Sequence, residues 1–152
     1  MDSCVIHKLP GQWRGLLIVF SLPLVINYED TDAAGVVYYA NYLAYMERVR
    51  NACLRDAGFP LSRVRDDYGA VFVVTEENLR YRGPAKLDVE ISVTLAVSRI
   101  RGASRVFQQQ VLRDGELPVD GLIRLATLDS DTFSPRRMPE VIRQALDRHR
   151  IE

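Results

Sequence analysis

The chain has 152 residues, of which 47% are hydrophobic and 26% are charged, a composition typical of one globular domain. Its 20 basic residues balance 20 acidic residues, so no excess of positive charge favours nucleic acid as a partner. The two cysteines, Cys4 and Cys53, have no partners at metal-ligand spacing. They predict reduced thiols and a cytoplasmic protein.

The first residues combine basic side chains with an apolar run, which is the layout of a secretory signal. Lys8 and Arg14 precede the apolar residues 16–26, but no small-x-small cleavage site follows the run. The run is also too short and too interrupted to cross a bilayer. We therefore expect no membrane span, and we interpret residues 1–19 as an N-terminal extension of uncertain order and residues 20–148 as one domain.

The first half of this domain predicts one strand and one long helix. Residues 22–28 form an apolar strand, and a loop rich in tyrosine and acidic residues follows. From residue 41 onward, apolar side chains recur at helical spacing: Leu43, Met46, Val49, Cys53 and Ala57. Gly58 and Pro60 then predict the end of the helix.

The second half predicts strands joined by turns. The apolar residues 71–75 begin a buried strand that runs toward Tyr81, where Gly83 and Pro84 break it. Residues 87–98 alternate strictly between apolar and polar side chains, as in a strand with one buried face. Further strands are expected at 105–112 and 122–128 and a terminal helix at 141–146, with Asp114-Gly115 as a hairpin turn. This order predicts an α+β fold in which an antiparallel sheet wraps around the long central helix.

The loop before the helix, residues 28–42, carries the candidate chemistry. A helix N-terminus has unpaired N–H groups and a partial positive charge, which together stabilise an oxyanion. Asp32 lies just before this terminus, so it is placed to act as a base or a nucleophile in acyl transfer. The spacing alone fits a carboxylate that caps the helix equally well. A calcium loop is disfavoured, because Ala34 stands at the fifth position, where an oxygen ligand is needed, and Asn41 stands where the bidentate glutamate belongs.

Residues 30–42, followed by Met46-Glu47-Arg48, closely resemble the signature of hotdog-fold acyl-CoA thioesterases. The similarity is to the Tol-Pal-associated and the 4-hydroxybenzoyl-CoA thioesterases. It continues through residues 72–74, 81–88 and 129–139 and spans roughly residues 20–146. The resemblance implies a hotdog fold and hydrolysis of an acyl-CoA without a metal or redox cofactor.

The resemblance also implies roles for individual residues. Asp32 corresponds to the catalytic carboxylate, and the backbone N–H of Tyr39 corresponds to the donor that polarises the thioester carbonyl. Tol-Pal-associated members often have histidine at the position of Tyr39, whereas the hydroxybenzoyl type has tyrosine. We therefore expect a role for the backbone at this position and none for an imidazole.

The expected substrate-binding residues are Gly35, Val37, Tyr38, Asn41, Arg99, Arg101 and Arg136. Gly35 would let the backbone approach the thioester closely. Asn41 would either cap the helix or bond to the loop before it. The three arginines are candidates because the phosphates of coenzyme A require basic groups near the pocket mouth, although a solvated surface charge is the alternative for each of them.

The resemblance implies active sites shared between subunits, and hence a homo-oligomer, either a dimer or a homotetramer. The alternative function is a binding module for acyl carrier protein or a lipid-synthesis complex. His7 and His149 fall in predicted tails, which disfavours a histidine-dependent triad, a zinc site or a dehydratase. Short aliphatic, long aliphatic and aromatic acyl groups are all compatible with the sequence.

Overall fold

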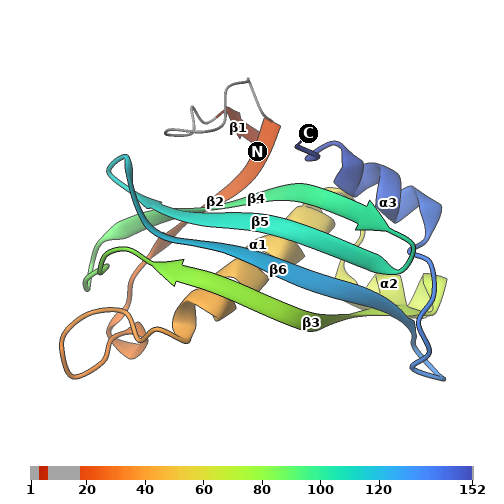
Figure 1. The fold of residues 1–152 in the computed structure, drawn as a ribbon, viewed down its shortest axis with the longest axis horizontal. Helices are drawn as coiled ribbons and strands as arrows, with labels where there is room; N and C mark the ends of the chain where they lie inside the picture. The colour runs from red at the N-terminus through yellow and green to blue at the C-terminus, as the bar shows by residue number, and fades with distance from the viewer. Residues whose placement is uncertain (1–3, 7–17, 152) are drawn as a thin grey trace.

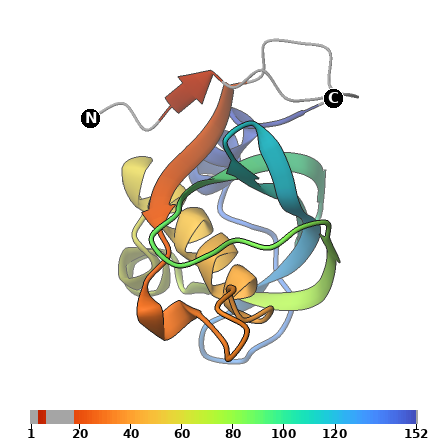
Figure 2. The same ribbon diagram turned by 90° about the vertical axis from the view of Figure 1, so that its left-hand side faces the viewer.

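The computed structural model describes residues 4–6 and 18–151. Within these residues, six antiparallel strands form one sheet that curves around a long helix (Figures 1 and 2). The predicted α+β class, with an antiparallel sheet wrapped around a central helix, is confirmed. No helix in the described ranges is long and apolar enough to cross a membrane.

The strands follow one another across the sheet in the order β1-β2-β4-β5-β6-β3. Their bounds are β1 Cys4–Ile6, β2 Ile18–Val25, β3 Ala70–Tyr81, β4 Glu90–Arg101, β5 Ser104–Arg113 and β6 Glu116–Asp129. The helices are the 3-10 turn η1 Tyr28–Asp30, α1 Asn41–Asp56, α2 Leu61–Tyr68 and α3 Glu140–Asp147. Strand β3 therefore lies at one edge of the sheet, where it pairs with β6.

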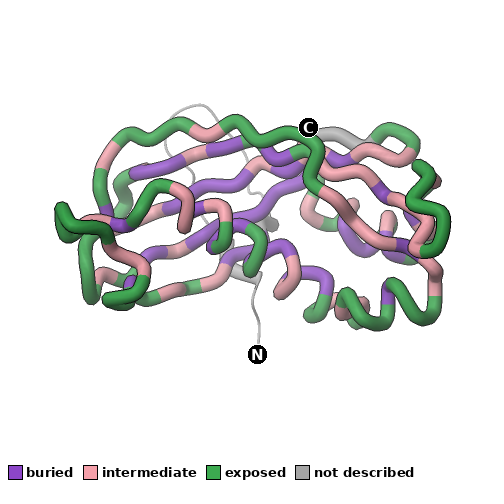
Figure 3. Tube along the Cα trace, turned by 90° about the horizontal axis from the view of Figure 1, so that it is seen from below, coloured by how far each residue is buried: buried purple, intermediate pink, exposed green. Residues whose placement is uncertain are grey.

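Helix α1 packs on the sheet through the stripe that its sequence predicts. Met46 and Val49 are fully buried, and Cys53 is nearly so. They belong to the same core as the apolar positions of β4, which are Ile91, Val93, Leu95 and Val97. Figure 3 shows the buried segments on the middle strands and along α1, with exposed loops at both ends of the molecule. Buried side chains recur about every 3.6 residues along the helix and every second residue along the strand, so each element turns one apolar face toward the same core.

The bounds of two strands differ from the prediction. Strand β2 starts earlier than expected and ends before Asn27, where the chain turns into η1. Strand β4 starts later than the alternating pattern suggests, because Asp88 adopts a φ of +64° and Leu87 is 39% exposed instead of buried. The backbone at Asp88 instead donates a hydrogen bond to the carbonyl of Ile26, at 3.0 Å. The hairpin at Asp114-Gly115 is confirmed, with φ values of +49° and +79°.

The C-terminal residues lie beside β4. The N–H of Val97 donates to the carbonyl of His149 at 2.8 Å, and the N–H of Ile151 donates to the carbonyl of Val97 at 2.9 Å. The predicted position of His149 in a tail is therefore wrong, because these backbone bonds dock the chain end on the sheet. His7 lies outside the described residues.

Candidate active site

The loop between η1 and α1 folds back on itself around Asp32. Thr31 pairs with Val37 in an antiparallel bridge, and the N–H of Asp32 donates to the carbonyl of Val36 at 2.9 Å. Gly35 closes the turn by donating its N–H to the carbonyl of Asp32, also at 2.9 Å. Its φ of +75° is a conformation that costs a residue with a Cβ atom roughly 1 kcal/mol or more. The glycine therefore allows the tight turn that presents Asp32.

The Asp32 side chain is held by its own loop. Its Oδ1 accepts a hydrogen bond from the backbone N–H of Ala34 at 2.8 Å. The residue is exposed, and no basic group of the described residues forms an ion pair with it. Ala40 occupies the N-cap position of α1. The carboxylate is thus fixed in orientation and accessible, and it does not serve as the cap of the helix.

Ala85 and Lys86, which precede β4, form backbone contacts with this loop. The N–H of Val37 donates to the carbonyl of the fully buried Ala85 at 2.9 Å, and Val36 pairs with Lys86 in a bridge. The side-chain amide of Asn41 donates to the carbonyl of Asp30 at 2.9 Å. Asn41 was expected either to cap the helix or to bond to the loop before it, and the structure shows the second of these. These contacts fix the loop against both the sheet and α1.

The backbone of Tyr39 lies at the turn that leads into α1. Among the described residues, none accepts a hydrogen bond from its N–H group. Its carbonyl accepts a hydrogen bond from the hydroxyl of Tyr81, at 3.1 Å, which ties the turn to the end of β3. The Tyr39 side chain is 61% exposed. The Tyr39 N–H, which is expected to polarise a thioester carbonyl, thus has no acceptor among the described residues. The bond from Tyr81 to the Tyr39 carbonyl holds this part of the backbone in place.

A cluster of tyrosine rings surrounds this turn. Tyr39 packs edge-on against Tyr81 with ring centroids 6.4 Å apart, and Tyr42 lies 5.8 Å from Tyr81. Burial raises the pKa of Tyr42, and burial together with the nearby carboxylate of Asp30 raises the pKa of Tyr45. Burial likewise raises the pKa of Tyr81. These phenols are therefore protonated at neutral pH, so they can donate hydrogen bonds but cannot act as bases.

The arginines expected to bind coenzyme A lie at the other end of the same protomer. Arg136 donates to the carbonyls of Tyr68 and Gly69, at 3.0 and 3.1 Å, just before β3 begins. Tyr81, which contacts Tyr39, is the last residue of that strand. At about 3.3 Å per residue, β3 is roughly 35 Å long, so Arg136 and Tyr39 lie at opposite ends of this strand.

The hairpin between β4 and β5 lies at the same distant end. Arg101 is exposed and pairs with Ser104, whose β6 neighbour Ala126 also pairs with Val73 near the start of β3. Arg99 belongs to this hairpin, although its side chain is outside the described part of the structure. The structure therefore brings together Asp32, Gly35, Val37, Tyr38, Tyr39 and Asn41, and it does not place the three arginines beside them within one protomer.

Two other basic residues lie close to the loop. Lys86 is exposed and pairs through its backbone with Val36. Arg113 reaches the carbonyl of Pro84 and also pairs with Glu116. The sequence argument missed both as candidates for phosphate binding, although Lys86 lies within the segment 81–88 that carries the resemblance. The described residues contain no cluster of three or more acidic, histidine or cysteine side chains that could hold a metal.

Residues 26–146 match the model of the thioesterase-like superfamily, which covers well over half of the chain. The protein belongs to this family. The geometry of the loop is consistent with a thioesterase. The Asp32 carboxylate and the backbone N–H of Tyr39 both precede the start of α1, and this N–H has no acceptor among the described residues. The resemblance found from residues 30–42 is thereby confirmed.

Relatives of this thioesterase-like protein support the same assignment. The acyl-CoA thioesterase YbgC of Haemophilus influenzae is 34% identical over 126 residues, which is 83% of this chain and 93% of that protein. The solved structure of a probable thioesterase from Bartonella henselae is 29% identical, with a TM-score of 0.75 over 80% of this chain and 99% of that one. A 1,4-dihydroxy-2-naphthoyl-CoA thioesterase from Synechocystis, 15% identical, shares the fold with a TM-score of 0.78 over 84% and 95% of the two chains. The hotdog fold is thus confirmed.

Proposed function

We propose that this protein hydrolyses acyl-CoA thioesters to a free acid and coenzyme A. The observation that carries the proposal is the accessible Asp32 carboxylate, which a tight turn presents on the same loop as the backbone N–H of Tyr39, a donor without an acceptor among the described residues. Membership of a thioesterase family and the acyl-CoA thioesterases among the relatives support the same reaction. No step requires a metal or a redox cofactor.

In the proposed mechanism, the Tyr39 N–H donates to the thioester carbonyl oxygen and stabilises the oxyanion that forms. Such a donor typically contributes about 3 to 4 kcal/mol to the transition state. Asp32 then follows one of two paths. As a base, it takes a proton from the water that attacks the carbonyl carbon. As a nucleophile, it forms an acyl-aspartyl anhydride that water hydrolyses. In both paths the C–S bond breaks and coenzyme A leaves as the thiolate, which then takes up a proton.

Binding of the coenzyme A phosphates is proposed to involve two subunits. Lys86 and Arg113 lie beside the loop of the same protomer, whereas Arg101 and Arg136 lie at the far end of β3. Because β3 is an edge strand, two copies can pair antiparallel through it, which brings the far end of one protomer next to the Asp32 loop of the other. We therefore propose a dimer as the minimal active unit, with Arg99, Arg101 and Arg136 acting across the interface.

The homotetramer implied by the resemblance would join two such dimers through other surfaces. A cytoplasmic location is also part of the proposal, because the substrate class and the low cysteine content fit a reducing compartment. Acyl carrier protein is retained as an alternative source of the thioester.

The reaction is tested by measuring thiol release from a panel of short, long and aromatic acyl-CoAs. We expect turnover well above the rate without enzyme for one acyl class, and a dependence on ionic strength in KM because phosphates are bound by basic residues. The absence of thiol release from every member of the panel would contradict the proposal. Binding of acyl carrier protein without hydrolysis would then support the alternative function.

Tyr81→Phe tests the positioning of the oxyanion donor. The variant loses the hydroxyl that bonds to the Tyr39 carbonyl but keeps the ring packing. We expect kcat to fall about three- to tenfold with KM changed less than about twofold, as for loss of one hydrogen bond. Tyr28→Phe, at a tyrosine that is 83% exposed, is the matched control and should retain the wild-type kcat. An unchanged kcat in Tyr81→Phe would show that this bond does not position the donor.

A further inference from the structure

Asp30 lies two residues before Asp32 and forms hydrogen bonds at both ends of the loop that presents it. Asp30 is the last residue of η1, and its Oδ2 accepts a hydrogen bond from the N–H of Asn27 at 2.8 Å. Its carbonyl accepts from the N–H of Tyr38 and from the side-chain amide of Asn41, both at 2.9 Å. Asp30 is therefore bonded to the chain before the loop, to the end of the loop and to the first residue of α1.

These bonds connect Asp30 to both groups of the proposed mechanism. Asp32 follows it by two residues, a span of at most about 7 Å along the chain. Tyr38, which donates to the Asp30 carbonyl, directly precedes Tyr39 and its N–H group. The position of Asp30 thus affects how the Asp32 carboxylate and the Tyr39 N–H lie relative to each other.

A buried hydroxyl without a partner lies beside Asp30. Tyr45 is 2% exposed, and its Oη has no hydrogen-bond partner within the described residues. Tyr45 lies four residues beyond Asn41, so both side chains project from the same face of α1, and Asn41 already bonds to Asp30. Burial and the nearby Asp30 carboxylate both raise the pKa of the Tyr45 phenol, as expected for two neighbouring groups.

The Asp30 carboxylate can supply the acceptor that Tyr45 lacks. Its Oδ2 bonds to Asn27, while its Oδ1 accepts from no donor in the described part of the chain. The χ2 torsion of an aspartate is broad, so the carboxylate can turn at little cost. A buried donor without an acceptor is unfavourable, and a bond to an ionised acceptor is stronger than one to a neutral group. Both effects favour a bond from the Tyr45 hydroxyl to Asp30.

We propose that Asp30 and Tyr45 form a positioning pair for hydrolysis, in which the Tyr45 hydroxyl donates to the Asp30 carboxylate and the main chain of Asp30 thereby holds Asp32 and the Tyr39 N–H in register. Neither member of the pair contacts the substrate in this proposal. Their role in catalysis rests on the proposed function, because it is exerted on the groups that the mechanism uses. The bond between them does not, so it can be measured without a substrate.

Proton exchange in the unliganded protein, followed by NMR, tests the bond. We expect the hydroxyl proton of Tyr45 to exchange slowly in wild type and at least about tenfold faster in Asp30→Asn, because an amide is a weaker acceptor than a carboxylate. The amide proton of Tyr38 should exchange faster in both Asp30→Asn and Tyr45→Phe, since each variant loosens Asp30. Wild-type exchange of the Tyr38 amide in both variants would overturn the proposal.

Thiol release from acyl-CoA tests the effect on hydrolysis. Asp30→Asn is expected to lower kcat about tenfold and Tyr45→Phe about three- to tenfold, with KM changed less than about twofold, because the pair acts on the geometry of the reacting groups. The double variant should lie within about twofold of Asp30→Asn, since both changes remove the same bond. Losses that multiply in full, or a wild-type kcat in Asp30→Asn, would contradict the pair.

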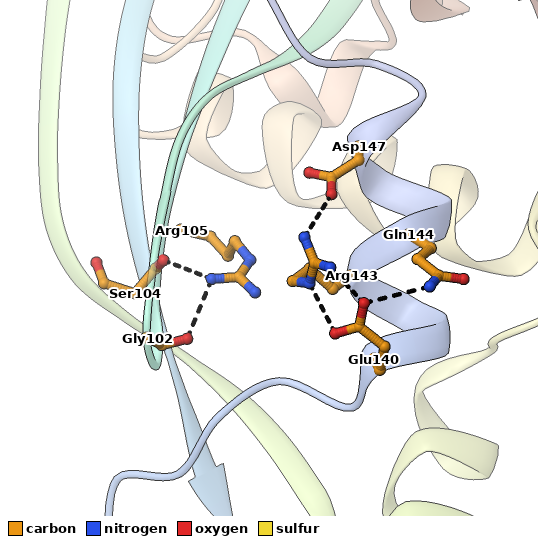
Figure 4. A network of polar contacts seen from close by, with 7 residues as sticks. All are labelled: Gly102, Ser104, Arg105, Glu140, Arg143, Gln144 and Asp147. Carbon is orange, nitrogen blue, oxygen red and sulfur yellow. Dashed lines mark hydrogen bonds and ion pairs between the residues drawn. The ribbon is translucent and has the colours of Figure 1, made fainter.

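Asp147→Asn is the matched control. Like Asp30, Asp147 is half-buried, and its Oδ1 is a buried atom without a partner among the described residues. Figure 4 shows it on α3, where its Oδ2 accepts from Arg143 at 2.9 Å, across from the hairpin of Gly102 and Ser104. Within one protomer this hairpin lies at the end distant from the Asp32 loop. We expect wild-type kcat and wild-type exchange of the Tyr38 amide in Asp147→Asn.

The outcomes separate this inference from the proposed function. Wild-type protein that releases no thiol would remove the proposed function and with it the role of the pair in hydrolysis. Active wild type with unchanged Asp30→Asn and Tyr45→Phe variants would remove only the pair. A fall in kcat in Asp147→Asn as large as that in Asp30→Asn would also overturn it, because loss of any half-buried carboxylate would then suffice. If Asp30→Asn does not fold, Tyr45→Phe decides through kcat and the exchange of the Tyr38 amide.

Discussion

Asp32→Asn is expected to lower kcat for acyl-CoA hydrolysis by about 100-fold or more, because a positioned acid or base contributes typically 10² to 10⁴. The amide cannot take a proton from water or attack the thioester. It keeps an oxygen that can accept the hydrogen bond from the N–H of Ala34, so the turn should keep its shape. KM should change little, since the carboxylate acts mainly in the transition state. Steady-state thiol release measures both constants.

Glu29→Gln is the matched control for this change. Glu29 is an exposed acidic residue in η1, three positions before Asp32, so its substitution removes one negative charge nearby without touching the candidate site. We expect wild-type kcat for Glu29→Gln. Retention of most of the activity in Asp32→Asn, with normal folding by circular dichroism, would remove Asp32 from the mechanism.

Gln109→Met is expected to lower the free energy of unfolding by about 2 to 4 kcal/mol, because it leaves several buried polar groups without a partner. Gln109 is fully buried in β5, where its Oε1 accepts from Arg50 at 2.9 Å. Its amide nitrogen donates to the carbonyl of Met46 at 3.0 Å and more weakly to that of Thr94 at 3.4 Å. The side chain thus joins α1 to two strands. Urea denaturation measures the loss.

The neighbouring glutamine supplies the control. Gln108→Met alters a half-buried residue on the opposite face of β5 and should change the unfolding free energy by no more than about 0.5 kcal/mol. Arg50→Met combined with Gln109→Met should recover part of the stability, because an apolar pair replaces a buried charge that has lost its partner. Equal stability of Gln109→Met and wild type would contradict the importance of this network.

Much of the fold was predictable because local patterns determine it. The helical spacing of Met46, Val49 and Cys53 predicts α1, and the alternation in residues 87–98 predicts most of β4. The hairpin at Asp114-Gly115 follows from the positive φ angles that this dipeptide tolerates. The bounds of β2 and β4 were less predictable, because the bond between Asp88 and Ile26 joins residues far apart in the sequence.

In the candidate site, too, some features follow from a local stretch of sequence and others depend on residues that are distant in the chain. A single stretch of sequence supplies Asp32, Gly35, Tyr39 and Asn41, so the sequence by itself determined which residues could carry the chemistry. It did not determine what holds them, which is the backbone of Ala85 and the hydroxyl of Tyr81. Nor could it place Arg136, which bonds to the carbonyls of Tyr68 and Gly69 at the far end of β3.

Only the tertiary structure decided which polar groups are buried together. In the sequence, Arg105 is one arginine among several near a turn, and Thr127 is an ordinary residue of a predicted strand. The pairing of β5 with β6 makes them diagonal neighbours, and both side chains are buried in the folded chain. The physical reason is that short-range periodicity records which face of an element is buried, whereas the partners on that face come from elements distant in the chain.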